Sequence, residues 1–117
     1  MKYGEIWFVQ FGELDQNDKN VQLHEYYKNR PALIIESNRQ LLVTSVITII
    51  PLTSQKNNNN DDIIIKKDDN NNLNYDSILK VQHIYSIDKS KFIKKIGEVD
   101  KESLIKVGEY LKRHFGL

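Results

Sequence analysis

The stretch Asn29-Arg30-Pro31-Ala32-Leu33-Ile34-Ile35-Glu36 decides how the rest of the chain is interpreted. Pro31 has no backbone N–H and a fixed φ, so it belongs at the first residue of a strand. The apolar, β-branched run after it predicts a buried strand over Pro31 to Glu36. Arg30 then lies where a long polar loop meets the sheet, and its guanidinium presents donors in a fork that suits a phosphate. A surface arginine in front of an ordinary core strand is the alternative interpretation.

Length and composition predict one compact domain over residues 1–117. The chain has no cysteine, which excludes disulfides and thiolate metal sites. Its net charge is +1, so nucleic-acid binding would require a local basic patch. The N-terminus lacks the pattern of a signal peptide, and no apolar run approaches the length of a membrane span. We therefore expect a soluble, cytoplasmic protein with no membrane association.

Further β-branched and aromatic runs predict a sheet around the first strand. The expected strands are Glu5–Phe11, a long central strand Leu41–Pro51, the short Ile63–Ile65, Ser77–Gln82 and an edge strand Ile93–Gly97 with its lysines outward. Ser37–Gln40 is expected to be a turn, and the two asparagine-rich segments around Ile63–Ile65 suggest a hairpin arm at the edge of the sheet. Asp88 is expected to cap a brief helical turn over Lys89–Phe92.

A C-terminal helix follows from its own start and stop signals. Asp100 predicts the N-cap, Val99 and Leu104 have hydrophobic-staple spacing, and Gly116 predicts the end. One helical face collects the apolar residues Leu104, Val107, Leu111 and Phe115. Gly108 lies between them and suggests close packing on the sheet. The expected fold is mostly β with α: a small antiparallel barrel or curled sheet plus a C-terminal helix.

Five short motifs follow one another along the chain: Gly4-Glu5-Ile6-Trp7, Glu25 ahead of Arg30-Pro31-Ala32-Leu33-Ile34-Ile35, Pro51-Leu52-Thr53-Ser54-Gln55, Ser86-Ile87-Asp88-Lys89-Ser90 and Lys95-Ile96-Gly97. In this order they resemble the MazF/PemK family of toxin endoribonucleases from bacterial toxin–antitoxin systems. The resemblance covers nearly the whole length of the chain. It implies an SH3-like barrel of the CcdB/MazF/PemK type, a homodimer, a cognate antitoxin as partner, and no cofactor or metal.

The resemblance also implies a chemistry, namely metal-independent cleavage of single-stranded RNA by attack of a ribose 2′-hydroxyl on the adjacent phosphorus. Arg30 matches the family arginine and would stabilise charge on the phosphoryl oxygens, and the Thr53 hydroxyl would donate to the same oxygens. His24 would be the general base or acid, because its unperturbed pKa is near neutrality. Glu25 would orient His24 or act alone.

Other residues are expected to contact RNA. They are Tyr26, Tyr27 and Lys28 in the long polar segment, Ser54 and Gln55 after the central strand, and Lys80, Gln82 and His83. The chain departs from the family at Tyr26–Asn29, where small residues or glycines are usual. It also departs at Gln82, where the family commonly has an acidic residue. Any acid–base role at that position is lost or passes to His83.

The sequence is also compatible with two alternative functions. The ending Phe115-Gly116-Leu117 loosely resembles that of CcdB-like toxins, which share the fold and bind DNA gyrase. A non-catalytic SH3-like binding module using Tyr26 and Tyr27 as its contact surface is the third possibility. The combination of Arg30-Pro31 with Thr53-Ser54 favours the nuclease.

Overall fold

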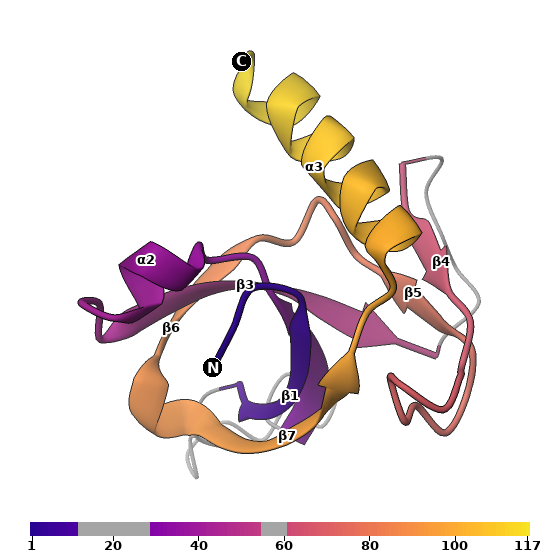
Figure 1. Cartoon of the computed structure of the whole chain (residues 1–117), viewed down its shortest axis with the longest axis horizontal. Helices are drawn as coiled ribbons and strands as arrows, with labels where there is room; N and C mark the ends of the chain where they lie inside the picture. Colours follow the sequence, from indigo (N-terminus) through magenta and orange to yellow (C-terminus); the bar gives the residue numbers. More distant parts are fainter. Residues whose placement is uncertain (12–28, 55–60) are drawn as a thin grey trace, which may run out of the picture.

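The chain forms an antiparallel sheet that carries one long helix at its C-terminal end, as the computed structural model in Figure 1 shows. The structure describes residues 1–11, 29–54 and 61–117. Its elements are, in chain order, β1 (Glu5–Gln10), β2 (Asn29–Ile34), α2 (Asn38–Leu41), β3 (Val46–Thr53), β4 (Ile63–Ile65), β5 (Ser77–Leu79), β6 (Tyr85–Asp88), the 3-10 helix η2 (Lys89–Lys91), β7 (Phe92–Glu98) and α3 (Lys101–Phe115).

The sheet is organised around β3. Its strand order is β4-β5-β3-β2-β1-β7, and β6 also pairs with β3. Ile49 is opposite Ile34 of β2 and Tyr85 of β6, so β2 and β6 lie on opposite edges of β3. Figure 1 shows the sheet curling round on itself, with α3 standing over one end. This arrangement confirms the expected fold class, an antiparallel curled sheet with a C-terminal helix.

Both faces of the central strands are buried. One face, here called the α2 face, gathers Val9, Ala32, Ile34, Ile47 and Ile49 with Leu41 of α2. The other, the α3 face, gathers Ile6, Leu33, Ile50, Leu52 and Leu79 with Val107 and Tyr110 of α3. Successive side chains of a strand point to opposite faces, so a strand buried on both sides has a continuous apolar sequence. That is the physical reason for the unbroken apolar runs in β2 and β3.

Several strand boundaries differ from the sequence-based expectation. Pro31 is the third residue of β2, because Asn29 and Arg30 already pair with Gln10 and Val9 of β1. The central strand runs from Val46 to Thr53 and not from Leu41 to Pro51. Ser37 caps the short helix α2 by accepting a hydrogen bond from the Gln40 N–H at 3.1 Å, and this helix replaces the expected turn. Leu42 is 85% exposed in consequence.

The expected arm at the sheet edge is present, with β4 as the terminal strand. β5 ends at Leu79 and not at Gln82, because the chain turns there: the His83 N–H donates to the Lys80 carbonyl at 2.8 Å. The asparagine-rich turn before β5 is a structured loop. The Asn71 side chain is buried, donates to the Lys66 carbonyl and accepts from the Asp68 N–H and the Leu73 N–H.

Capping residues bound the helical segments as expected. Asp88 caps η2 by accepting from the Ser90 N–H, and Asp100 caps α3 by accepting from the Ser103 N–H, both at 2.9 Å. Gly116 ends α3 in the left-handed conformation, at φ 70°. The expectation of close packing at Gly108 is wrong, because a Cβ there would meet nothing within 4 Å. Phe115 is exposed, since the end of α3 extends beyond the sheet (Figure 1).

Residues of the first sequence motif, Gly4–Trp7, contact Lys95 of the last motif. The buried Glu5 carboxylate accepts from Trp7 Nε1 at 3.0 Å and pairs with Lys95 Nζ at 2.9 Å. Burial raises the pKa of Glu5, but hydrogen bonds from Trp7, Lys95 and the Lys2 N–H outweigh it and hold the pKa below its usual value. The same contact with Glu5 raises the pKa of Lys95. Contacts of Glu5 in β1 with Lys95 in β7 therefore stabilise the pairing of these two strands.

Candidate functional site

Arg30 and Thr53 lie at the ends of neighbouring antiparallel strands, β2 and β3. The register pairs Ile34 with Ile49, Leu33 with Ile50 and Ala32 with Pro51. Continued by two residues, it places Arg30 opposite Thr53. Arg30 is also the partner of Val9 in β1, and both Arg30 and Thr53 are half-buried. Strand alternation puts the two side chains on the α2 face, where a guanidinium and a hydroxyl can approach one anion.

A row of aromatic rings extends the same face. Tyr85 is opposite Ile49 in the pairing of β3 with β6. Its ring lies edge-on to Phe11 at 5.9 Å and to His83 at 6.5 Å, measured between ring centroids. Tyr85 is 38% exposed and His83 is exposed, so the row is accessible to a ligand. Neither Phe11 nor Tyr85 is among the site residues expected from sequence, which places Phe11 only at the end of the first strand and Tyr85 in no strand.

Lys80 is placed next to the end of β3, since its N–H donates to the Pro51 carbonyl at 3.0 Å. Its ammonium forms an ion pair with the Asp62 carboxylate at 2.9 Å, and the side chains are 19% and 1% exposed, respectively. A buried carboxylate needs a partner of opposite charge. Lys80 therefore has a structural role in joining the β4 and β5 hairpin, whether or not it contacts RNA.

Two further expected residues lie elsewhere on the surface. Ser54 alternates with Thr53, so its side chain belongs to the α3 face, where it lines a cavity with Phe8 and Pro31. Gln82 lines a hollow with Tyr110, Arg113 and His114 of α3. Burial raises the pKa of Tyr110 in this hollow, and the carboxylates of Asp61 and Asp62 raise it further. His83 therefore lies with Arg30 on the α2 face, whereas Gln82 lies beside the helix α3.

Six expected site residues lie outside the described part of the chain: His24, Glu25, Tyr26, Tyr27, Lys28 and Gln55. Within residues 1–11, 29–54 and 61–117, no three histidine or carboxylate side chains come together as a metal site would require. No helix in the described segments has both the length and the hydropathy needed to span a bilayer.

Comparison with known families assigns the chain. The sequence profile described as "PemK-like, MazF-like toxin of type II toxin-antitoxin system" matches residues 2–115. The chain belongs to this family. The match covers all five motifs that carry the resemblance, and the predicted membership is confirmed. A search of curated proteins found no match.

Solved structures of MazF toxins and of a mycobacterial endoribonuclease share the fold. A MazE–MazF complex from Deinococcus radiodurans superposes with a TM-score of 0.78 at 17% identity, covering 100% of this chain and 96% of that one. The Mycobacterium tuberculosis toxin MazF-mt6 gives 0.73 at 19% identity, with 97% of each chain covered. A mycobacterial endoribonuclease in complex with its cognate antitoxin gives 0.76 at 16% identity, covering 100% and 96%. At these identities the likeness establishes the fold alone.

Proposed function

We propose that this PemK-like toxin is a metal-independent endoribonuclease that cleaves single-stranded RNA. The ribose 2′-hydroxyl loses its proton to a base and its oxygen bonds to the adjacent phosphorus. The bond from phosphorus to the 5′-oxygen breaks, and that oxygen takes up a proton. The products are a 2′,3′-cyclic phosphate and a 5′-hydroxyl, and no water is consumed. Such a site needs donors for the phosphoryl oxygens and groups that move the two protons.

The observation that carries the proposal is the register of β2 against β3, which brings Arg30 opposite Thr53 when it is continued by two residues. The guanidinium of Arg30 would hold two phosphoryl oxygens in a bidentate contact, and the Thr53 hydroxyl would donate to one of them. The row of the half-buried Phe11 and the exposed Tyr85 and His83 on the same face supports the choice of a single-stranded substrate. Unpaired bases stack on such rings, whereas paired bases in a duplex cannot reach them.

The proton transfers are assigned to histidine and carboxylate groups. His24 is proposed as the general base or acid, with Glu25 orienting it or acting alone. His83 is the proposed alternative, because its exposed ring lies edge-on to Tyr85 on the α2 face. Tyr26, Tyr27 and Lys28 are proposed to contact the RNA with Ser54, Gln55, Lys80 and Gln82.

The proposed partners are a second copy of the chain and an antitoxin, in the cytoplasm. Exposed apolar side chains on α3 (Ile105, Phe115) and at Leu117 support a C2 homodimer. Light scattering at micromolar concentration should give the dimer mass.

A disordered, acidic antitoxin segment is proposed to fold over Arg30 and to compete with RNA. Independent, simultaneous binding of antitoxin and RNA would contradict that competition.

The test is cleavage of a long RNA by the purified protein, with and without EDTA. We expect equal rates in both and products carrying a cyclic phosphate. Complete inhibition by EDTA would refute the metal-independent mechanism. Uncleaved RNA together with gyrase binding would favour the CcdB-like alternative, and uncleaved RNA without it would favour the non-catalytic binding module.

Arg30→Ala is expected to lower the cleavage rate by about 100-fold or more, the effect of losing one oxyanion donor. Arg30→Lys should rescue only partly, since an ammonium cannot reproduce the bidentate fork. Thermal melting must show that both variants are folded. Wild-type cleavage by folded Arg30→Ala would refute the site.

A further inference from the structure

A cavity of about 510 Å³ lies on the α3 face, behind the strand ends that carry Arg30 and Thr53. Its lining includes Pro31, which follows Arg30, and Leu52 and Ser54, which flank Thr53. Because neighbouring residues of a strand point to opposite faces, the cavity and the Arg30–Thr53 pair use the same strand ends from opposite sides.

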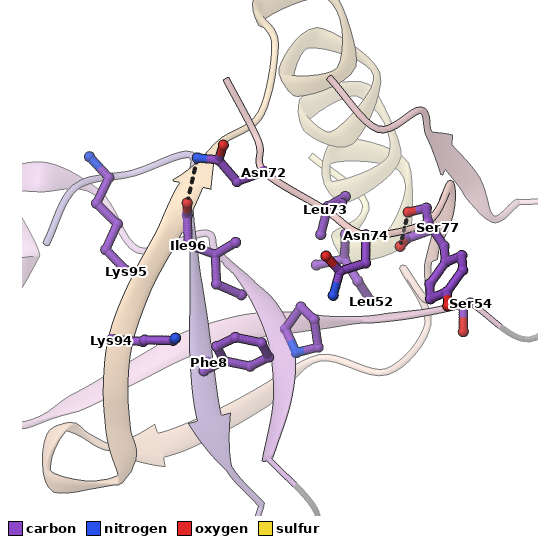
Figure 2. A pocket seen from close by; sticks show the side chains of 12 residues that line it. Phe8, Leu52, Ser54, Asn72, Leu73, Asn74, Ser77, Lys94, Lys95 and Ile96 are labelled. Carbon is purple, nitrogen blue, oxygen red and sulfur yellow. Dashed lines mark hydrogen bonds between the residues drawn. The ribbon is translucent and has the colours of Figure 1, made fainter. Parts of the chain in front are cut away.

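The floor of the cavity is apolar and its rim is polar. Phe8 and Pro31 provide flat apolar surfaces, and the two are partners in the pairing of β1 with β2. Lys94 Nζ lies 5.4 Å from the centroid of the Phe8 ring and forms no ion pair with any described residue. Asn74 faces Lys94 and Phe8 from across the cavity, with its amide directed inward (Figure 2).

The Asn74 amide makes no hydrogen bond within the described part of the chain, whereas the amide of Asn72 donates to the Ile96 carbonyl at 2.9 Å. Asn74 therefore offers two N–H donors and one acceptor to a ligand. No carboxylate of the described residues lines the cavity. Of its two lining lysines, Lys95 is already paired with Glu5 and Glu98, so Lys94 supplies the positive charge for a ligand. A ligand with a planar apolar ring, a mixed donor and acceptor edge and a negative charge matches this lining.

We propose that the cavity binds one nucleotide of the RNA that flanks the cleaved position, an inference that rests on the proposed ribonuclease function. The base packs against Phe8 and Pro31, its polar edge bonds to Asn74, and Lys94 contacts its phosphate. The RNA passes over the ends of β2 and β3, so that the reacting phosphate is on one face and the flanking nucleotide is on the other. An acidic peptide matches Lys94, but it leaves the two-sided hydrogen-bonding capacity of Asn74 without a specific use.

The kinetic test uses RNAs shortened one nucleotide at a time from either end. Asn74→Ala and Lys94→Ala should each raise KM about tenfold on RNAs long enough to fill the cavity, the effect of losing one good polar contact. Their kcat should change less than about twofold, because neither residue touches the reacting phosphate. The shortest RNA that is cleaved should not distinguish the variants from the wild type. Asn70→Ala and Lys89→Ala are matched controls, since both residues are exposed and neither lines the cavity.

The binding test does not depend on cleavage. Titrating ribonucleoside monophosphates to millimolar concentration should shift the NMR signal of the Asn74 side-chain amide in the wild-type protein. Lys94→Ala should weaken this binding and Lys89→Ala should not. Absence of a shift with every nucleotide, or a shift with an acidic peptide only, overturns the proposal whether or not RNA is cleaved. Wild-type KM values for both cavity variants, in a protein that does cleave RNA, overturn the proposal and leave the ribonuclease function standing.

Discussion

Replacing Gly97 by alanine perturbs the tightest backbone contact of the sheet. A Cβ at Gly97 would lie 2.6 Å from the carbonyl carbon and oxygen of Asn71, and it would also collide with the Asn70 carbonyl oxygen. The loop that carries these atoms is held in place, since the Asn70 carbonyl accepts the Glu98 N–H at 3.0 Å and Asn71 is 1% exposed. Backbone atoms cannot rotate away as a flexible side chain can, so β7 or the loop has to move.

The expected cost follows from three effects. Overpacking of a well-packed site costs about 1–3 kcal/mol. Loss of the Glu98–Asn70 hydrogen bond would add about 1 kcal/mol. Alanine restricts the unfolded chain more than glycine does, which returns about 0.4–1 kcal/mol. The net effect is a loss of about 2 kcal/mol of unfolding free energy, or about 6–10 °C in Tm for a domain of this size.

Urea unfolding followed by circular dichroism measures this loss, and Gly108→Ala is the matched control. A Cβ at Gly108 would meet nothing within 4 Å, so alanine there should raise helix stability by about 1 kcal/mol. The two substitutions are chemically identical and opposite in expected sign. A Gly97→Ala midpoint at or above that of the wild type, measured beside a stabilised Gly108→Ala, would refute the contact.

Four other outcomes are expected. Thr53→Val should slow RNA cleavage, because it removes the hydroxyl and keeps a β-branched side chain at the end of β3; cleavage at the wild-type rate by a variant that thermal melting shows to be folded would remove Thr53 from the site. Tyr85→Leu should weaken RNA binding about fivefold or more, measured by fluorescence anisotropy, through loss of a stacking surface. Asp100→Ala should lower the unfolding free energy by about 1 kcal/mol in urea, since it removes the N-cap of α3. Glu5→Gln should destabilise the protein by about 1–3 kcal/mol above its ordinary pKa of 4.5, where the wild-type carboxylate is charged and paired. The folded-state pKa of Glu5 is lowered, so this difference should shrink as pH falls through and below that value in unfolding measured from pH 7 to pH 3.

Local signals predicted the parts of the fold that have local causes. Asp88, Asp100 and Gly116 act within a few residues of themselves, and each caps or ends its element as expected. The apolar run from Leu41 was assigned to one strand because apolar content does not reveal where a chain reverses. The reversal depends on Ser37, whose hydroxyl starts a helix in place of the expected turn. Gly108 was expected to pack closely on the sheet because glycine is costly in a helix. The position with no room for a Cβ is instead Gly97, because the loop at Asn70, distant in the sequence, lies against it.

The two candidate sites, the Arg30–Thr53 pair and the cavity, differ in how much of each could be predicted from the sequence. Arg30 and Thr53 follow from strand ends and an antiparallel pairing, both of which leave a pattern in the sequence. The cavity depends on Lys94 lying over Phe8, and that pairing stands between two register shifts of β1 against β7. A register shift of one residue exchanges the faces of a strand and leaves no mark in its composition. Strand alternation then links the sites, because the residues next to Arg30 and Thr53 must line the opposite face. An RNA held by its phosphate on one side of these strand ends therefore has a preformed cavity within reach on the other.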